Sequence, residues 1–97
     1  MTTTQQRTYQ LPLDREQQDA WLAWWRGVSV PRVKYGFSIK SAVLDRETGI
    51  FTWMVSHDGD FAAAEQAYVA SPERADVFTR PAPAITVLKI SLVDVLV

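Results

Sequence analysis

The sequence predicts a small α+β domain with a four-stranded antiparallel sheet and helices on one face of that sheet. Four segments alternate in side-chain character as strands do, and two segments repeat apolar side chains at helical spacing. Their order is strand, helix, strand, strand, helix, strand (βαββαβ), which is typical of the split βαβ, or ferredoxin-like, arrangement. We expect residues 1–97 to form one domain, with the polar residues 1–6 flexible.

The first strand and the first helix follow one another directly. Residues 7–11 alternate, with Arg7, Tyr9 and Leu11 on one face, and Pro12 ends the strand. Asp14 is a suitable cap for the helix that follows. The apolar stripe of this helix contains Trp21, Leu22, Trp25 and Val28. We expect the helix to end between Gly27 and Pro31.

Two further alternating segments, 33–44 and 50–57, predict a β-hairpin closed by the polar loop 45–49. One face of the first strand is expected to contain Val33, Tyr35, Phe37, Ile39 and Val43. One face of the second strand is expected to contain Phe51, Trp53, Val55 and His57. The opposite faces also carry apolar residues, so neither side of the hairpin is wholly polar.

The second half of the chain repeats the helix-then-strand pattern. A helix should begin near Asp60 and present Phe61, Ala64 and Tyr68 on one stripe. Ser71 followed by Pro72 predicts the start of a short extra helix that reaches about Phe78. After two breaking prolines, residues 85–97 read as the last strand.

The last strand carries apolar groups on both faces. One face is expected to contain Val87, Val93 and Val95, and the other Leu88, Ile90, Leu92 and Leu96. Because helices cover only one side of such a sheet, the bare side would expose a large apolar patch, which soluble monomers rarely tolerate. We therefore expect a homodimer formed sheet against sheet.

Composition and charge exclude several classes of function. A net charge of -1 without a basic run argues against a nucleic-acid partner. The absence of cysteine excludes thiolate chemistry, and one histidine cannot build a closed zinc site. The turn Asp58-Gly59-Asp60 has Val69, not glutamate, at its twelfth position and so does not fit a calcium loop. We expect no metal or cofactor, no membrane partner and a cytoplasmic location.

Three motifs point to a family. They are Arg7-Thr8-Tyr9-x-Leu11, then Trp53-(x)4-Asp58-Gly59-Asp60-Phe61, then Tyr68-(x)2-Ser71-Pro72-Glu73-Arg74. Together they resemble the NIPSNAP-like proteins of the dimeric α+β barrel superfamily, over most of the chain. In that superfamily two ferredoxin-like chains join their sheets into a barrel. Its members include cofactor-independent antibiotic-biosynthesis monooxygenases, EthD-like proteins and haem-binding enzymes, so the resemblance implies the fold more strongly than the activity.

The aromatic residues suggest a ligand pocket between sheet and helices. Candidate ligand-binding residues are Trp25, Tyr35, Phe37, Trp53 and Tyr68. Such walls suit a flat aromatic or polyketide-like molecule. If the protein is an enzyme, the resemblance implies cofactor-independent oxygenation or a related isomerisation or cyclisation. In that reading His57 or Arg7 would withdraw a proton or stabilise an enolate.

Other readings of the same residues remain open. The aromatic side chains can simply fill the core of a non-catalytic structural or interaction protein. His57, at a strand end, can bond to a loop carbonyl or to water. A haem-binding barrel is a further alternative, with His57 as the iron ligand.

Overall fold

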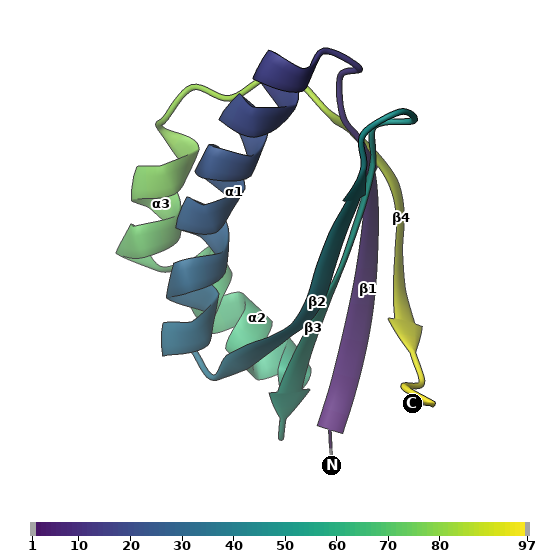
Figure 1. Ribbon diagram of the computed structural model, residues 1–97. Helices are drawn as coiled ribbons and strands as arrows, with labels where there is room; N and C mark the ends of the chain where they lie inside the picture. Colours follow the sequence, from purple (N-terminus) through teal and green to yellow (C-terminus); the bar gives the residue numbers. More distant parts are fainter. Residues whose placement is uncertain (1, 97) are drawn as a thin grey trace.

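The computed structural model describes residues 2–96. Its elements are β1 (Thr2–Gln10), α1 (Arg15–Lys34), β2 (Phe37–Asp45), β3 (Ile50–Asp58), α2 (Phe61–Val69), α3 (Pro72–Phe78) and β4 (Thr86–Val93). The three helices form one layer and the sheet forms the other (Figure 1). The strand order is β2-β3-β1-β4 and all neighbours are antiparallel. These features confirm the predicted ferredoxin-like α+β fold, with the predicted short helix as α3.

Side-chain caps begin all three helices at the expected positions. Asp14, Asp60 and Ser71 each accept a hydrogen bond from the backbone N–H three residues later, at 3.0 to 3.2 Å. Such a bond satisfies one of the free N–H groups of the first helical turn. The sequence signals for these starts therefore correspond to real caps.

The predicted end of the first helix is wrong, because α1 continues through Pro31 to Lys34. Proline has no N–H and cannot bond to the carbonyl four residues earlier, but this close to the helix end only one bond is lost. The last turn is held instead by Arg32, whose side chain is buried. Val33 therefore lies in the helix and Tyr35 at its C-cap, and β2 begins only at Phe37.

Two irregularities in the sheet change which side chains share a face. The register of β2 against β3 shifts between Ile39 and Ser41, so Val43 does not share the helix-facing side with Phe37 and is exposed. The register of β4 against β1 shifts between Lys89 and Val87. This second shift puts Val87 on the same face as Ile90 and corrects the predicted grouping. A bulge of this kind cannot be read from alternation alone.

The first and last strands also differ from the predicted lengths. β1 starts at Thr2, so the polar residues 2–6, expected to be flexible, pair with β3 on one side and in part with β4 on the other; residue 1 lies outside the described residues. β4 ends at Val93, and residues 94–96 continue without strand structure. Residue 97, the predicted strand end, lies outside the described part.

The core lies between the helices and the two central strands, β3 and β1. Its buried apolar residues are Tyr9, Leu11, Trp21, Val28, Phe37, Phe51, Trp53, Val55, Tyr68 and Val77. Phe61 and Ala64 of α2 pack against this cluster, which confirms the predicted stripe. The edge strand β4, by contrast, leaves Leu88, Ile90 and Leu92 exposed.

Candidate functional site

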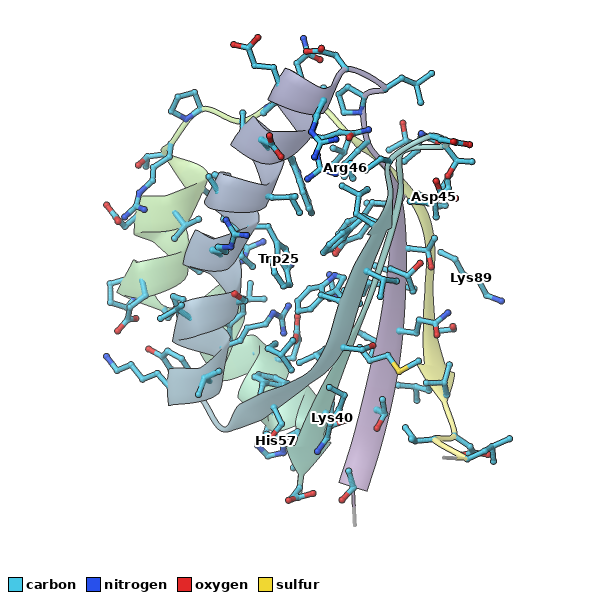
Figure 2. The ribbon with its side chains drawn as sticks, in the orientation of Figure 1. Trp25, Lys40, Asp45, Arg46, His57 and Lys89 are labelled. Carbon is cyan, nitrogen blue, oxygen red and sulfur yellow. The ribbon has the colours of Figure 1, made fainter. Side chains whose placement is uncertain are left out.

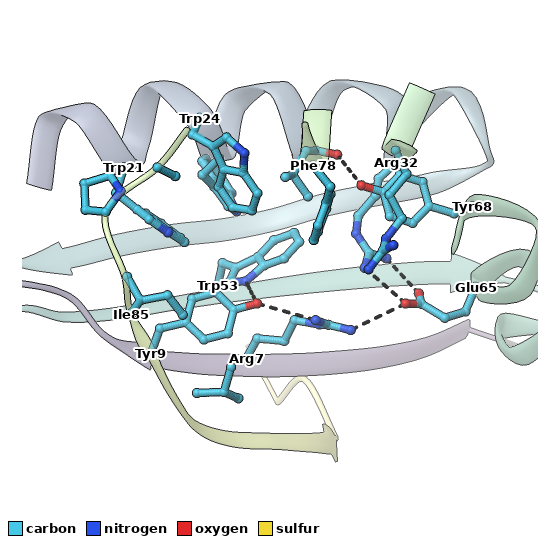
Figure 3. A pocket seen from close by; sticks show the side chains of 16 residues that line it. Arg7, Tyr9, Trp21, Trp24, Arg32, Trp53, Glu65, Tyr68, Phe78 and Ile85 are labelled. Atoms are coloured by element: carbon cyan, nitrogen blue, oxygen red, sulfur yellow. Dashed lines mark hydrogen bonds and ion pairs between the residues drawn. The ribbon is translucent and has the colours of Figure 1, made fainter. Parts of the chain in front are cut away.

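A cavity of about 440 Å3 lies between the two layers. Its floor comes from β1, β3 and β4, its walls from the three helices, and one side from the segment between α3 and β4. The lining residues are Arg7, Tyr9, Trp21, Trp24, Trp25, Val28, Arg32, Trp53, Glu65, Tyr68, Arg74, Phe78, Ala82, Pro83, Ile85 and Val87 (Figure 3). Its volume falls in the range of small-molecule sites.

Aromatic rings make up much of the cavity wall. Trp25 packs edge-on against Trp53 with ring centroids 5.3 Å apart, and Trp24 packs edge-on against Phe78 at the same separation. The indole N–H of Trp53 donates to the Tyr9 hydroxyl at 3.1 Å. The indole N–H of Trp25 is buried and has no hydrogen-bond partner within residues 2–96. The wall is thus largely apolar with a few fixed polar points.

Charged side chains from four elements, among them Arg74 of α3, gather around Glu65 at one end of the cavity. Glu65 of α2 accepts two hydrogen bonds from the Arg32 guanidinium of α1, at 2.8 and 3.1 Å. Arg7 of β1 approaches the same carboxylate at 3.5 Å. Arg32 is 3% exposed and stacks over Tyr68, with its guanidinium carbon 4.4 Å from the ring centroid. The two-pronged bond to Glu65 satisfies a charge that would otherwise be buried alone.

The electrostatics of this cluster set the protonation of its members. Burial alone would raise the pKa of the Glu65 carboxyl, but the Arg32 hydrogen bond and the charges of Arg32, Arg7 and Arg74 outweigh burial and lower the pKa. Burial raises the pKa of the Tyr68 hydroxyl despite the nearby arginines. That hydroxyl donates to the carbonyl of Val28 at 3.2 Å. At neutral pH Glu65 is therefore ionised and Tyr68 is neutral.

Helix α3 forms a wall of the cavity and is fastened to α1 at two points. The indole N–H of Trp24 donates to the carbonyl of Val77 at 3.0 Å. Glu73 accepts hydrogen bonds from Lys34 and from the Tyr35 hydroxyl. The Lys34 hydrogen bond, a backbone N–H and the Tyr35 hydroxyl lower the pKa of Glu73 to about 2. These contacts hold the wall in place over the tryptophans.

The structure brings some of the predicted site residues together and places others elsewhere. Arg7, Trp25, Trp53 and Tyr68 line the cavity, whereas Tyr35, Phe37 and His57 do not. Phe37 is buried in the core and packs edge-on against His57 with centroids 5.3 Å apart. Tyr35 bonds to Glu73 outside the cavity.

His57 occupies a niche near the end of β3, at a different level of the molecule from Trp25 (Figure 2). Two glycine turns flank its ring. A Cβ atom on Gly36, whose φ is 90°, would approach the His57 Nε2 to 3.1 Å, and one on Gly59 would lie 3.4 Å from the ring. Its Nδ1 is buried without a partner in the described chain. A role as base, or as haem ligand, in the 440 Å3 cavity is not supported by this position.

Sequence reasoning missed several of the lining residues, above all Arg32 and Glu65. Arg32 falls four residues after Val28, on the continuation of the apolar stripe of α1. A charged residue on an apolar stripe is the signal that could have found it, but the early helix end predicted at Pro31 hid that spacing. Glu65 looks like an ordinary exposed residue of an alanine-rich helix, and no sequence signal distinguishes it.

Two kinds of feature were sought in the described part of the chain, clusters of metal-ligating side chains and helices that could span a membrane. Residues 2–96 contain no group of three or more histidine, aspartate or glutamate side chains placed to hold a metal ion. No helix within the same residues is both long and apolar enough to cross a membrane.

Comparison with known proteins gives a structural likeness and no sequence relative. No family model matches the chain, and no curated protein matches it. A crystal structure of a candidate antibiotic biosynthesis monooxygenase from Bacteroides thetaiotaomicron VPI-5482 superposes with a TM-score of 0.60 and 16% identity. The match covers 97% of this chain and 87% of the other. At this identity the likeness establishes a shared ferredoxin-like α+β fold; it does not establish the reaction.

Proposed function

We propose that this protein binds a small, flat, largely apolar aromatic molecule in the cavity between its sheet and helices. The observation that carries the proposal is a space of about 440 Å3 walled by indole and phenol rings. Planar rings stack well against such walls, and sites of this volume take up drug-sized ligands. If the aromatic residues only formed the core of a protein that binds no ligand, side chains would be expected to fill this space.

The unsatisfied polar groups of the wall also support a ligand. The buried N–H of Trp25 lacks an acceptor within residues 2–96. Buried donors are nearly always paired in folded proteins, so a ligand oxygen would be a partner for this N–H once the indole turns toward the cavity. A polyketide-like molecule has a flat apolar body that fits the aromatic wall, and its ring carbonyls can accept hydrogen bonds from donors of that wall.

Saturable quenching of tryptophan fluorescence by a planar hydroxyanthraquinone tests the proposal. We expect Trp53→Phe to weaken binding roughly three- to tenfold, because the smaller ring offers less stacking surface. Phe61→Leu is the control, since Phe61 packs against Phe37 outside the cavity lining, and it should bind as the wild type does. Thermal melts establish that both variants fold. A wild type that shows no saturable quenching would remove the proposal.

Cofactor-independent oxygenation is a second candidate function, favoured by the surroundings of the Tyr9 hydroxyl. This oxygen accepts from Trp53 at 3.1 Å and lies 3.5 Å from an Arg7 nitrogen, so its own proton is free to donate to a ligand oxygen. Such donors stabilise an enolate, which is the form of an aromatic substrate that reacts with oxygen. The titratable lining residues are arginines, tyrosines and Glu65, and the lowered pKa of Glu65 makes it a weak base. The geometry therefore supports binding ahead of turnover, and oxygen uptake with an enolisable anthrone measures the difference.

We further propose that the chain acts as a homodimer of the α+β barrel type, in keeping with its NIPSNAP-like motifs. Val43 is 62% exposed on the outer face of the sheet and Leu96, beyond the end of β4, is 89% exposed, so this side carries apolar surface that a partner would cover. The outer face of the sheet also holds a broad depression that includes Met54 and Val93. These features support an interface on the side away from the helices.

Paired substitutions on β4 test the dimer. Val93 pairs with Thr4 and lies on the outer face, whereas Leu92 pairs with Gln5 and lies on the helix-facing side. We expect Val93→Glu to give a monomer because it buries a charge between the sheets, and Leu92→Glu to stay dimeric. Light scattering at micromolar concentration gives the masses. A monomeric wild type would contradict the proposal.

A further inference from the structure

We propose that the ligand of this cavity carries an anionic oxygen group, a carboxylate or an enolate, which binds between Arg7 and Arg74 beside the Tyr9 hydroxyl. This inference rests on the proposed function, namely that a flat aromatic molecule occupies the cavity, and it adds the chemical class of that molecule. It follows from the charge balance of the lining, from the hydrogen-bond donors left free, and from the position of these donors between the charged end and the apolar end of the cavity.

The cavity lining carries an excess of positive charge. Three guanidinium groups, those of Arg7, Arg32 and Arg74, face one carboxylate, that of Glu65, so two positive charges are left over. Arg74 stacks over Phe78, with its guanidinium carbon 4.0 Å from the ring centroid, and forms no ion pair within residues 2–96. In a partly enclosed site such an excess attracts an anion more strongly than it would in water.

Hydrogen-bond donors toward this anion remain available on Arg7. Arg32 uses both of its terminal nitrogens on Glu65. Arg7 holds Gln5 with its Nε at 2.7 Å, but its two terminal nitrogens make only long contacts of 3.5 Å, one to Tyr9 and one to Glu65. A ligand carboxylate could therefore take both terminal nitrogens in the two-pronged geometry that arginine favours.

The charged groups and the apolar groups lie at opposite ends of the cavity. Figure 3 shows Arg32, Glu65 and Tyr68 at one end, with Trp21 and Ile85 at the other. Arg7 and the Tyr9 hydroxyl lie between them, beside the ring of Trp53. A flat molecule that fills the apolar end would thus place a group on its opposite edge against Arg7. A neutral molecule of the same shape would leave the two positive charges without a counter-charge.

Calorimetric titration with two ligands of the same shape tests the inference. The probes are 2-naphthoate, which is anionic at neutral pH, and 2-naphthamide, which is neutral. We expect 2-naphthoate to bind wild type at least tenfold more tightly, because hydrogen bonds between charged groups are about twice as strong as neutral ones. Arg7→Gln should reduce this preference to less than threefold while still binding 2-naphthamide. Lys89→Gln removes the same charge from the outer side of the sheet (Figure 2) and should keep the full preference.

Each outcome separates the inference from the proposed function. Equal affinities for the two probes in wild type would overturn the anionic class and leave the aromatic pocket standing. A preference for 2-naphthoate that drops equally in Arg7→Gln and Lys89→Gln would also overturn it, because general attraction to the protein would then explain the effect. Failure of the naphthoate, the naphthamide and the hydroxyanthraquinone alike would overturn the pocket itself.

Discussion

Two parts of the space between helices and sheet differ in how completely side chains fill it. Over β2 and β3, Phe37, Phe51 and Val55 are at most 2% exposed. Over β1 and β4, a cavity of about 440 Å3 remains, and Val87 of β4 is 54% exposed. The same layered fold thus contains a closely packed part and an open part.

The cause of this difference lies in which elements cover which strands. The long helix α1 packs against β2, and α2 packs against β3. Toward β1 and β4 the tryptophans of α1 are joined only by the seven-residue α3 and the proline-containing segment that follows it. A short helix and a loop cannot fill the width of two strands, so the cavity is a consequence of the element lengths. The cavity therefore lies where the helices cover β1 and β4 incompletely.

The largest expected effect contrasts one phenylalanine from each part. Phe51 is buried among Tyr9, Trp21 and Trp25, whereas Phe78 is half exposed at the cavity wall. Phe51→Ala should cost about 3–5 kcal/mol of unfolding free energy, because it leaves a hole in a packed region. Phe78→Ala should cost about 1 kcal/mol. Urea denaturation of both variants measures the contrast, and equal costs would show that the two parts are packed alike.

Sequence reasoning succeeded best where a signal is local. The caps at Asp60 and Ser71 and the stripe of Phe61, Ala64 and Tyr68 all lie within a few residues of one another. Such signals depend on backbone hydrogen bonds and helical periodicity, which a short window of sequence already determines. The fold class, which depends only on the order of elements, was therefore predictable.

The parts that could not be predicted depend on contacts between distant residues. Pro31 looked like a helix end, yet the buried contacts of Arg32 with Glu65, 33 residues away, stabilise one more turn. The bulges that move Val43 and Val87 arise from pairing with a neighbouring strand. Trp53 and Arg7 pair on the adjacent strands β3 and β1, so both line the same cavity. The arginine cluster was missed because four elements build it jointly.

The last and smallest expected effect concerns the ionised Glu65 that balances the arginine end of the open part. Its pKa is lowered in the folded chain relative to the ordinary value of 4.5. A lowered folded pKa means that the ionised carboxylate stabilises the fold above the unfolded pKa. That contribution is lost as the pH falls through the lower folded pKa. Glu65→Gln should therefore reduce stability at pH 7 by about 1–3 kcal/mol, because Arg32 keeps its buried charge with a weaker acceptor.

The pH profile of stability makes this expectation specific to Glu65. Urea midpoints of the wild type should fall as the pH drops from 5 to below the lowered pKa, and Glu65→Gln should lose that part of the fall. Glu47→Gln is the control, because Glu47 is an exposed hairpin-loop carboxylate for which no ion pair is found within residues 2–96. Its profile should follow that of the wild type. If Glu65→Gln and wild type decline in parallel over this range, the ionised Glu65 does not stabilise the arginine end of the cavity.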